Sequence, residues 1–280
     1  MRSNLRRLAF GLSTLVGWRQ KGWFIPYRYA AALSDADRRA GYPALRRLFM
    51  ESESSFAALL DQIDGFAEDL QAIGGAPPPA PRFDQDWFPR LDAMAAYAIV
   101  RSRKPTRVVE VGSGHSTRFL TRAVADGGLD TEIVAIDPAP RAPIAGLPIS
   151  IQRAALQDAD RGPFTALEAG DVLFVDSSHI LMPGSDVDIL FNAILPELPS
   201  GVLVHIHDVF LPDHYPLLWD WRAYNEQQAV AVMIAGGGYR VLFASHYVAT
   251  AMADRLAVGV VADVALVAGA VETSLWLEKT

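Results

Sequence analysis

The sequence predicts an α/β protein built on a doubly wound, mostly parallel sheet, and three observations lead to this fold class. Short β-branched runs alternate with helical stretches through the last two thirds of the chain. The first run, residues 108–111, stops at a Gly-Ser-Gly turn that leads directly into a helical stretch. Acidic or imidazole side chains follow several later runs, where the strands are expected to end. Strand, tight turn and helix in this order are typical of the first unit of a nucleotide-binding sheet.

Length and composition limit the kind of protein that this can be. The 280 residues suffice for one large domain, or for a domain with an appendage. Hydrophobic residues make up 51% of the chain, which provides a substantial core and excludes global disorder. The chain has no cysteine, so disulfides, thiolate metal sites and cysteine nucleophiles are excluded. This composition fits a reducing cytoplasm, which is the expected location.

Charge is distributed unevenly along the chain. Residues 1–50 hold ten Lys and Arg against two Asp, a net charge of +8, so the overall charge of −7 leaves −15 for residues 51–280. An acidic main body argues against a nucleic-acid partner, because phosphate binding needs clustered cations. We therefore expect a small-molecule partner and no nucleic acid.

The basic N-terminal region contains an apolar run, residues 8–18, between arginines. The run is too short to span a bilayer, and no small-x-small cleavage site follows it, as a signal peptide would require. A basic amphipathic segment could instead lie on an anionic membrane surface. We favour a helix packed on the body, or a frayed terminus, over this membrane contact.

The next stretch is helical and ends at a linker. Apolar residues recur at intervals of three and four across residues 42–73, which predicts an amphipathic helix. Two glycines end it, and the proline-rich stretch 77–81 makes a stiff extended linker. We place a domain boundary there. Residues 1–82 are expected to form a basic, mainly helical extension, and residues 83–280 the α/β domain.

The remaining elements alternate as a doubly wound sheet requires. Helices are predicted at residues 90–101, 186–195 and 219–235, and strands at residues 131–136, 148–151, 171–176, 201–208, 239–244 and 273–277. Residues 250–270, rich in Ala and Val, fit either a helix or a strand.

The loop after the first strand has the composition of a ligand site. Gly112 and Gly114 lack a Cβ and let the backbone approach a ligand closely. Thr117 stands where the dinucleotide fingerprint has its third glycine, and Glu110 lies two residues before the first. The next strand ends in Asp137, where an adenosine ribose would meet a carboxylate.

This combination resembles motif I, and the acidic position after it, of the class I S-adenosylmethionine-dependent methyltransferases. The resemblance implies a Rossmann-like sheet of seven strands, with residues 273–277 as an antiparallel last strand. It also implies S-adenosylmethionine as cofactor. The residues expected to bind it are Glu110, Gly112, Ser113, Gly114, Ser116, Asp137 and Asp176. Ser116 or Thr117 is also expected to cap the helix that follows the glycines.

Two later strand ends are similar to those of a subgroup, methyltransferase family 24, whose relatives include metal-dependent sugar and catechol O-methyltransferases. Asp176 and His179 follow one strand, and His207 and Asp208 follow the next. The carboxyl ends of parallel strands meet at one edge of a sheet, so these side chains should converge. The resemblance implies that Asp176 and Asp208 bind Mg²⁺ and that His179 is the general base.

One residue departs from that pattern. His207 stands where the metal enzymes prefer Glu or Asp, and Mg²⁺ prefers oxygen ligands. Either a softer divalent ion binds to Asp176, His207 and Asp208, or the reaction needs no metal and a histidine removes the proton. In the second case His179, or else His207, is the catalytic base. His205 and His207 share a face of their strand, and at least one can be a hydrogen-bonded core residue.

The sequence thus predicts a methyltransferase that acts on a hydroxyl oxygen of a small molecule, such as a sugar, a phenol or another natural product. Two alternatives stay open: an NAD(P)-dependent oxidoreductase, and a methyltransferase-like module that binds a partner without catalysis. The absent third glycine and the lack of an evident Tyr-x-x-x-Lys pair count against the oxidoreductase. A homo-oligomer is compatible with the sequence, which does not give the number of subunits.

Overall fold

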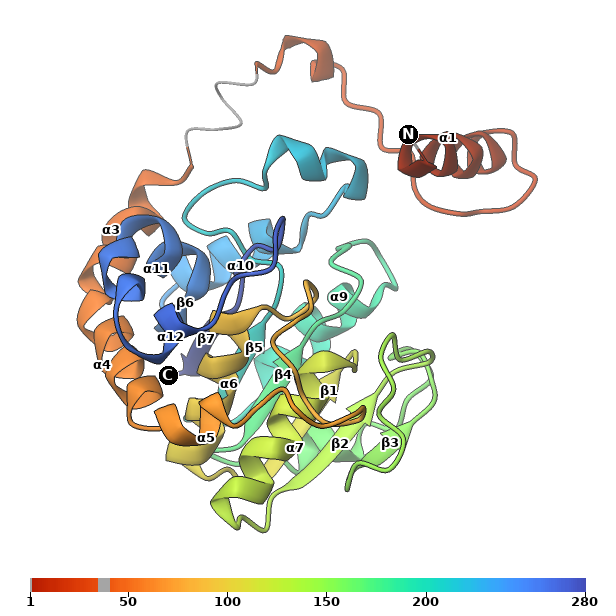
Figure 1. The fold of residues 1–280 in the computed structure, drawn as a ribbon. Coiled ribbons are helices and arrows are strands. Elements are labelled where there is room, and N and C mark those ends of the chain that lie inside the picture. Colours follow the sequence, from red (N-terminus) through yellow and green to blue (C-terminus); the bar gives the residue numbers. More distant parts are fainter. Residues whose placement is uncertain (1, 35–40) are drawn as a thin grey trace.

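The centre of the molecule is a seven-stranded sheet (Figure 1). The computed structural model describes residues 2–34 and 41–280, and of residues 2–4 only the backbone. The strands are β1 (Arg107–Val111), β2 (Glu132–Ile136), β3 (Ser150–Gln152), β4 (Val172–Val175), β5 (Leu203–Ile206), β6 (Tyr239–Ala244) and β7 (Leu275–Lys279). Their order in the sheet is β3-β2-β1-β4-β5-β7-β6. The predicted strands are confirmed, although β3, β5 and β7 each begin two residues later than expected.

The direction of the strands agrees with the Rossmann-like sheet. Strands β1 to β5 pair in parallel, whereas β7 runs antiparallel between β5 and β6. The antiparallel last strand is therefore confirmed, and it lies inside the sheet. The register aligns the ends of the central strands, because Val111 pairs with both Ile136 and Val175, and Val175 pairs with Ile206. The loops that follow these four strands therefore all leave the sheet at the same edge.

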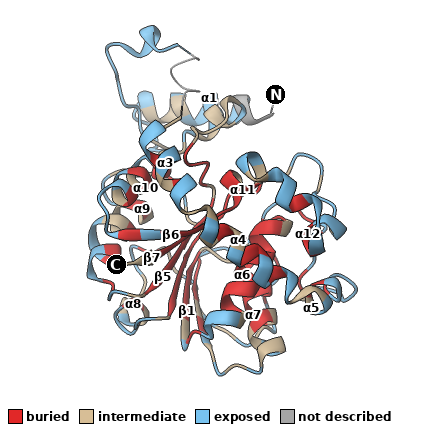
Figure 2. Ribbon diagram, turned by 90° about the vertical axis from the view of Figure 1, so that its left-hand side faces the viewer, coloured by how far each residue is buried: buried red, intermediate tan, exposed pale blue. Residues whose placement is uncertain are grey.

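Helices cover both faces of the sheet. Figure 2 shows the strands as a buried layer with α4, α6 and α7 on one side and α9 and α10 on the other. The α-helices are α1 (Arg2–Leu15), α3 (Pro43–Glu51), α4 (Glu53–Asp64), α5 (Ala67–Gln71), α6 (Arg90–Arg103), α7 (His115–Gly127), α8 (Gly162–Thr165), α9 (Asp186–Ile189), α10 (Glu226–Ala235), α11 (Ser245–Ala251) and α12 (Gly259–Asp263). Short 3-10 helices are η1 (Ala30–Ala32), η3 (Leu195–Glu197), η4 (Leu217–Arg222) and η5 (Ala253–Ala257), and η2 (Leu190–Ile194) is a π-helical turn.

The helical stretch before the linker is divided and belongs to the same core as the sheet. Three helices, α3, α4 and α5, replace the single predicted helix over residues 42–73. Phe49 and Phe56 are fully buried and meet Phe243 and Tyr247 edge-on or tilted, with ring centroids about 6 Å apart. Aromatic packing of this kind joins the helices of the N-terminal region to β6 and α11.

Two other helical predictions are corrected. The helix expected over residues 219–235 is broken into η4 and α10, because Ala223 between them has φ +54°. Helix α7 begins at His115 with Gly114 as its N-cap residue, so neither Ser116 nor Thr117 is the N-cap, although the Thr117 hydroxyl accepts from the Gly114 amide in a capping box. Residues 250–270 contain the end of α11, η5 and α12, and no strand.

Helix α1 differs from the others because its apolar side chains are exposed. Leu5, Leu8, Leu12 and Leu15 lie outside the buried core, and the helix contacts the body through Arg7 and η4 instead. Within the described residues, none of the helices has both the length and the apolarity needed to cross a membrane.

Candidate active site

A cavity of about 830 Å³ opens over the carboxyl ends of β1, β2 and β4. Its walls include six of the residues predicted to bind the cofactor: Gly112, Ser113, Gly114, Ser116, Asp137 and Asp176. The strand register explains this convergence, because the loops that carry these residues leave the sheet at one level. The cavity therefore lies where open α/β sheets bind their ligands.

The two glycines of the loop have different roles. Gly112 has φ +82°, and a Cβ on it would overlap the backbone carbonyl oxygen of Asp176. This glycine is required by the packing of the chain itself. A Cβ on Gly114 would make only ordinary contacts, the nearest at 3.7 Å from Ala142. The protein leaves space beside Gly114, and that space belongs to the cavity.

Glu110 lies behind the loop and does not line the cavity. It is fully buried, and the hydroxyls of Ser116 and Thr117 each donate a hydrogen bond of 2.6 Å to its carboxyl group. The Thr117 hydroxyl also accepts a hydrogen bond from the Gly114 amide. Burial raises the pKa of Glu110 to about 8, although these hydrogen bonds lower it. The position suits a residue that holds the loop in shape.

Asp137 fastens the same loop from β2 and faces the cavity. One carboxylate oxygen accepts hydrogen bonds from the amide and hydroxyl of Ser113, at 2.7 and 2.9 Å. The other accepts from the amide of Ala139 at 2.7 Å. The oxygen that accepts from Ala139 has a second lone pair, so Asp137 can still accept from a hydroxyl group of a ligand.

Aromatic and basic side chains form the outer wall of the cavity. Trp87 lies beside it with the guanidinium of Arg141 4.9 Å from its ring centroid, a cation–π arrangement. His115 also lines the wall, and burial together with the charges of Arg118 and Arg82 lowers its pKa to about 4, so its ring is neutral near pH 7. Together, a flat aromatic surface, a carboxylate and a glycine loop can hold a nucleoside.

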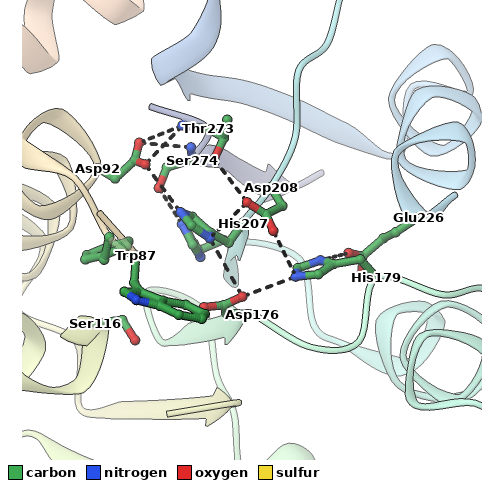
Figure 3. Close-up of polar contacts among 12 residues, drawn as sticks. Trp87, Asp92, Ser116, Asp176, His179, His207, Asp208, Glu226, Thr273 and Ser274 are labelled. Atoms are coloured by element: carbon green, nitrogen blue, oxygen red, sulfur yellow. Dashed lines mark hydrogen bonds and ion pairs between the residues drawn. The ribbon is translucent and has the colours of Figure 1, made fainter. Parts of the chain in front are cut away.

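Next to the cavity, His179 lies among three carboxylates (Figure 3). Its Nδ1 is 2.8 Å from Glu226, and its Nε2 is 3.3 Å from both Asp176 and Asp208. Burial lowers the pKa of His179, but hydrogen bonds to Asp176 and Glu226 and the charges of the carboxylates outweigh it and hold the pKa well above its usual range. The side chain of Asp176 is 36% exposed, whereas that of His179 is 5% exposed, so Asp176 separates the imidazole from the cavity.

His207 occupies the centre of the same cluster. Its Nε2 is 3.3 Å from buried Asp92 on α6, and its Nδ1 is 3.7 Å from both Asp176 and Asp208. Burial lowers the pKa of His207, and the surrounding carboxylates more than compensate, so the pKa lies well above the usual value. Asp92 is anchored in turn, because it accepts hydrogen bonds from the amides of Thr273 and Ser274 at the start of β7.

Backbone conformation marks the same place. Four residues other than glycine in the described part of the chain have positive φ: Lys104, His179, Asp208 and Ala223. His179 and Asp208, with φ +61° and +56°, belong to the cluster. Such conformations are costly for residues with a Cβ and concentrate where function requires them.

The donors of this cluster do not fit a metal ion in this arrangement. Among the described residues, no three His, Asp or Glu side chains are placed to hold one. Both nitrogens of His207 face carboxylates, and the imidazoles of His179 and His207 approach the oxygens of Asp176 and Asp208 that a cation would need. Metal binding by Asp176, His207 and Asp208 stays a prediction, and no step below uses a metal.

Comparison with known proteins agrees with this geometry. Residues 109–209, which carry the glycine loop, Asp137, and the ends of β4 and β5, match a family model described as a methyltransferase domain, Methyltransf_24. The match covers 101 of the 280 residues. The resemblance drawn from the sequence is confirmed over these residues. No curated protein matches the chain.

Two solved structures are similar to this chain at low identity. The Podospora anserina methyltransferase PaMTH1, described as bound to SAH, is 16% identical over 92% of this chain and 99% of its own, with a TM-score of 0.42. A methyltransferase from Geobacter sulfurreducens is 15% identical over 68% of this chain and 78% of its own, with a TM-score of 0.39.

The sequence did not indicate two residues of this site, Asp92 and Arg141. Asp92 lies within an amphipathic helix, where an acid usually faces solvent, whereas Glu226 fits on sequence either the lining of the cleft or a solvated helix face. Arg141 lies in an irregular loop with no motif. His205 is a core residue, as expected for one of the two strand histidines: it stacks on Phe174 and forms a 2.8 Å hydrogen bond with Ser274.

Proposed function

We propose that this protein is an S-adenosylmethionine-dependent methyltransferase that transfers the methyl group to a hydroxyl oxygen of a small molecule, such as a sugar or a phenol. One observation carries the proposal. Asp176 lines the nucleoside-sized cavity and also contacts His179, so a cofactor site and a candidate base share one residue.

The cavity supplies the groups that an adenosyl cofactor needs. Asp137 would accept a hydrogen bond from a ribose hydroxyl, and the flat face of Trp87 would cover the adenine. The space at Gly114 lets the ligand approach the backbone. Ser177, also in the cavity wall, has a buried hydroxyl that lacks a hydrogen-bond partner among the described residues. When bound, S-adenosylmethionine supplies the electrophilic methyl group.

His179 is proposed as the base that takes the acceptor proton. Glu226 at Nδ1 fixes the proton on that nitrogen, which leaves Nε2 to accept another. Oxygen nucleophiles need such a base because a neutral hydroxyl is a weak nucleophile. The main contribution of the protein would be to align the acceptor oxygen with the methyl group. His207, held between Asp92 and Asp176, is the alternative base.

Titration with S-adenosylhomocysteine tests the cofactor site. We expect saturable binding to the wild-type protein, and binding at least about tenfold weaker for Asp137→Ala, because a lost hydrogen bond to a charged group costs about 1.5–3 kcal/mol. Asp137→Asn retains an oxygen that can accept from Ser113. It therefore shows whether Asp137→Ala weakens binding because the loop moves or because the hydrogen bond to the ligand is lost. Asp130→Ala, on an exposed loop, is the matched control.

A folded wild-type protein that binds no S-adenosylhomocysteine would refute the proposal. Binding without transfer to any sugar or phenol tested would instead favour a binding module that retains the methyltransferase fold. Thermal unfolding of each variant separates lost binding from lost structure.

The dependence of rate on pH tests the base. His179 must be neutral to accept a proton, and its pKa is raised, so turnover should rise with pH through a value above 6.5. Glu226→Gln removes a carboxylate that stabilises the charged imidazole, so the pKa of His179 falls. The rise of turnover with pH should then occur about one pH unit lower. Glu53→Gln, which alters a carboxylate bonded to Tyr247, is the control. If turnover rises over the same pH range in Glu226→Gln as in the wild type, His179 is not the titrating base.

A further inference from the structure

Helix α1 is amphipathic along its whole length. At 100° per residue, Leu5, Leu8, Leu12 and Leu15 fall on one side, and Val16 continues that side beyond the helix. Arg6 and Arg7 lie on other sides of the helix. The segment contains no acidic residue before position 35. Together, these features define one apolar face, and the only charged residues on the rest of the helix are basic.

The apolar face is open in this structure. The side chains of Leu5, Leu8, Leu12, Leu15 and Val16 are between 53 and 72% exposed. These five residues are contiguous on the helix, which distinguishes them from single exposed leucines that need no explanation. Figure 1 shows α1 apart from the sheet and the helices that cover it.

The other face of α1 approaches the body. The Arg7 guanidinium donates to the backbone carbonyl of Asp220 on η4, at 3.4 Å. Angular spacing places Arg7 about 140° from Leu12, so this contact turns the apolar face away from the protein. Residues 19–21, which follow the helix, are hydrogen-bonded to its last turn. The Thr14 hydroxyl accepts from the Lys21 amide, and the Ser13 hydroxyl donates to the Arg19 carbonyl.

Aromatic residues extend the exposed surface beyond the helix. Trp18 is 86% exposed, and the following stretch adds further open aromatic and apolar side chains: Trp23, Phe24, Ile25, Tyr27 and Tyr29. Tryptophan and tyrosine, with an apolar ring and a polar edge, are enriched where a bilayer meets water. Arg19, Lys21 and Arg28 are interleaved with these rings.

Charge indicates which surface this segment fits. Residues 1–50 carry +8, whereas residues 51–280 carry −15. An anionic bilayer attracts the first part and repels the second, which fixes the orientation of the molecule on the surface. An α1 of 14 residues is too short to span the hydrocarbon layer, but it suits a helix lying in the interface plane.

We propose that α1 and residues 16–29 dock this protein on an anionic lipid membrane surface, with the leucine face in the acyl boundary and the arginines among the headgroups. Trp23 belongs to this segment and also lines the cavity, so docking would hold the mouth of the cavity next to the lipid. The proposal goes beyond the methyltransferase function and does not depend on cofactor binding.

Co-sedimentation of the full chain with lipid vesicles tests this docking. We expect binding to vesicles that contain phosphatidylglycerol and at least about tenfold weaker binding to pure phosphatidylcholine vesicles. Raising the salt from about 0.05 to about 0.5 M should weaken binding to the anionic vesicles severalfold, because exposed charges are screened. Leu8→Glu/Leu12→Glu should lower that binding by at least about tenfold.

A matched variant controls for charge and lost apolar surface. Val232→Glu/Val258→Glu makes the same change in net charge at two exposed apolar residues on α10 and before α12, and should bind as the wild type does. Failure of the wild type to bind anionic vesicles, or equal binding by both double variants, would overturn the proposal. So would an α1-dependent dimer in sedimentation velocity without vesicle binding, which would show that a second copy covers the leucine face.

Discussion

Gly112→Ala is expected to reduce the free energy of unfolding by about 3 kcal/mol or more, or to prevent folding. Two costs combine at this position. A residue with a Cβ pays about 1–2 kcal/mol for a left-handed conformation, and the new methyl group would also overlap the carbonyl oxygen of Asp176. That carbonyl cannot move freely, because the Asp176 amide donates to Val111 and fixes the start of the loop. Denaturant unfolding followed by circular dichroism measures the loss.

Gly146→Ala separates the two costs. Gly146 has φ +88°, close to that of Gly112, but nothing lies within 4 Å of the position that a Cβ would take. This variant should lose only the conformational cost, about 1–2 kcal/mol. If both variants lose the same free energy of unfolding, the overlap with Asp176 is relieved without cost. Packing would then not be the reason that a glycine is needed at position 112.

His179→Gln is expected to lower turnover by about 10²- to 10⁴-fold, the usual contribution of a general base. The amide keeps the size and some hydrogen-bonding capacity of the imidazole but cannot accept a proton near neutral pH. The affinity for S-adenosylhomocysteine should change by less than about threefold, because His179 does not line the cavity. The measurement is single-turnover transfer from labelled S-adenosylmethionine to the sugar or phenol with the highest wild-type rate.

His246→Gln is the control for this loss. His246 also pairs with a carboxylate, at 3.2 Å from Asp213, but belongs to α11 and not to the cluster around Asp176. Its variant should turn over at nearly the wild-type rate. If His179→Gln retains wild-type turnover while His207→Gln loses it, the proton goes to His207 and the roles of the two imidazoles are reversed.

The strand ends explain why much of the site could be predicted. Residues 132–136, 172–175 and 203–206 are short, mostly apolar runs, and the polar residue after each run indicates where the strand stops. In a parallel sheet all such ends point the same way, so Asp137, Asp176 and His207 are expected at one edge without knowledge of coordinates. The structure confirms that edge through the aligned register.

Partners of the histidines could not be predicted in this way. Asp92 comes from α6 and Glu226 from α10, on opposite faces of the sheet, and each is fully buried. On a sequence, an acid in an amphipathic helix is read as solvent-facing. The imidazoles that contact these two carboxylates are more than 40 residues away along the chain.

The sequence by itself determined the doubly wound sheet and the glycine loop, because hydrophobic periodicity and turn residues are local properties. Tertiary structure decided which groups are charged and which glycine is indispensable. A pKa depends on burial and on neighbours from other elements, as at His179, and the clash at Gly112 comes from the end of the neighbouring strand. The exposure of α1 is likewise tertiary: the amphipathic pattern predicts an apolar face, and only the packing of the whole chain shows that the protein does not cover it.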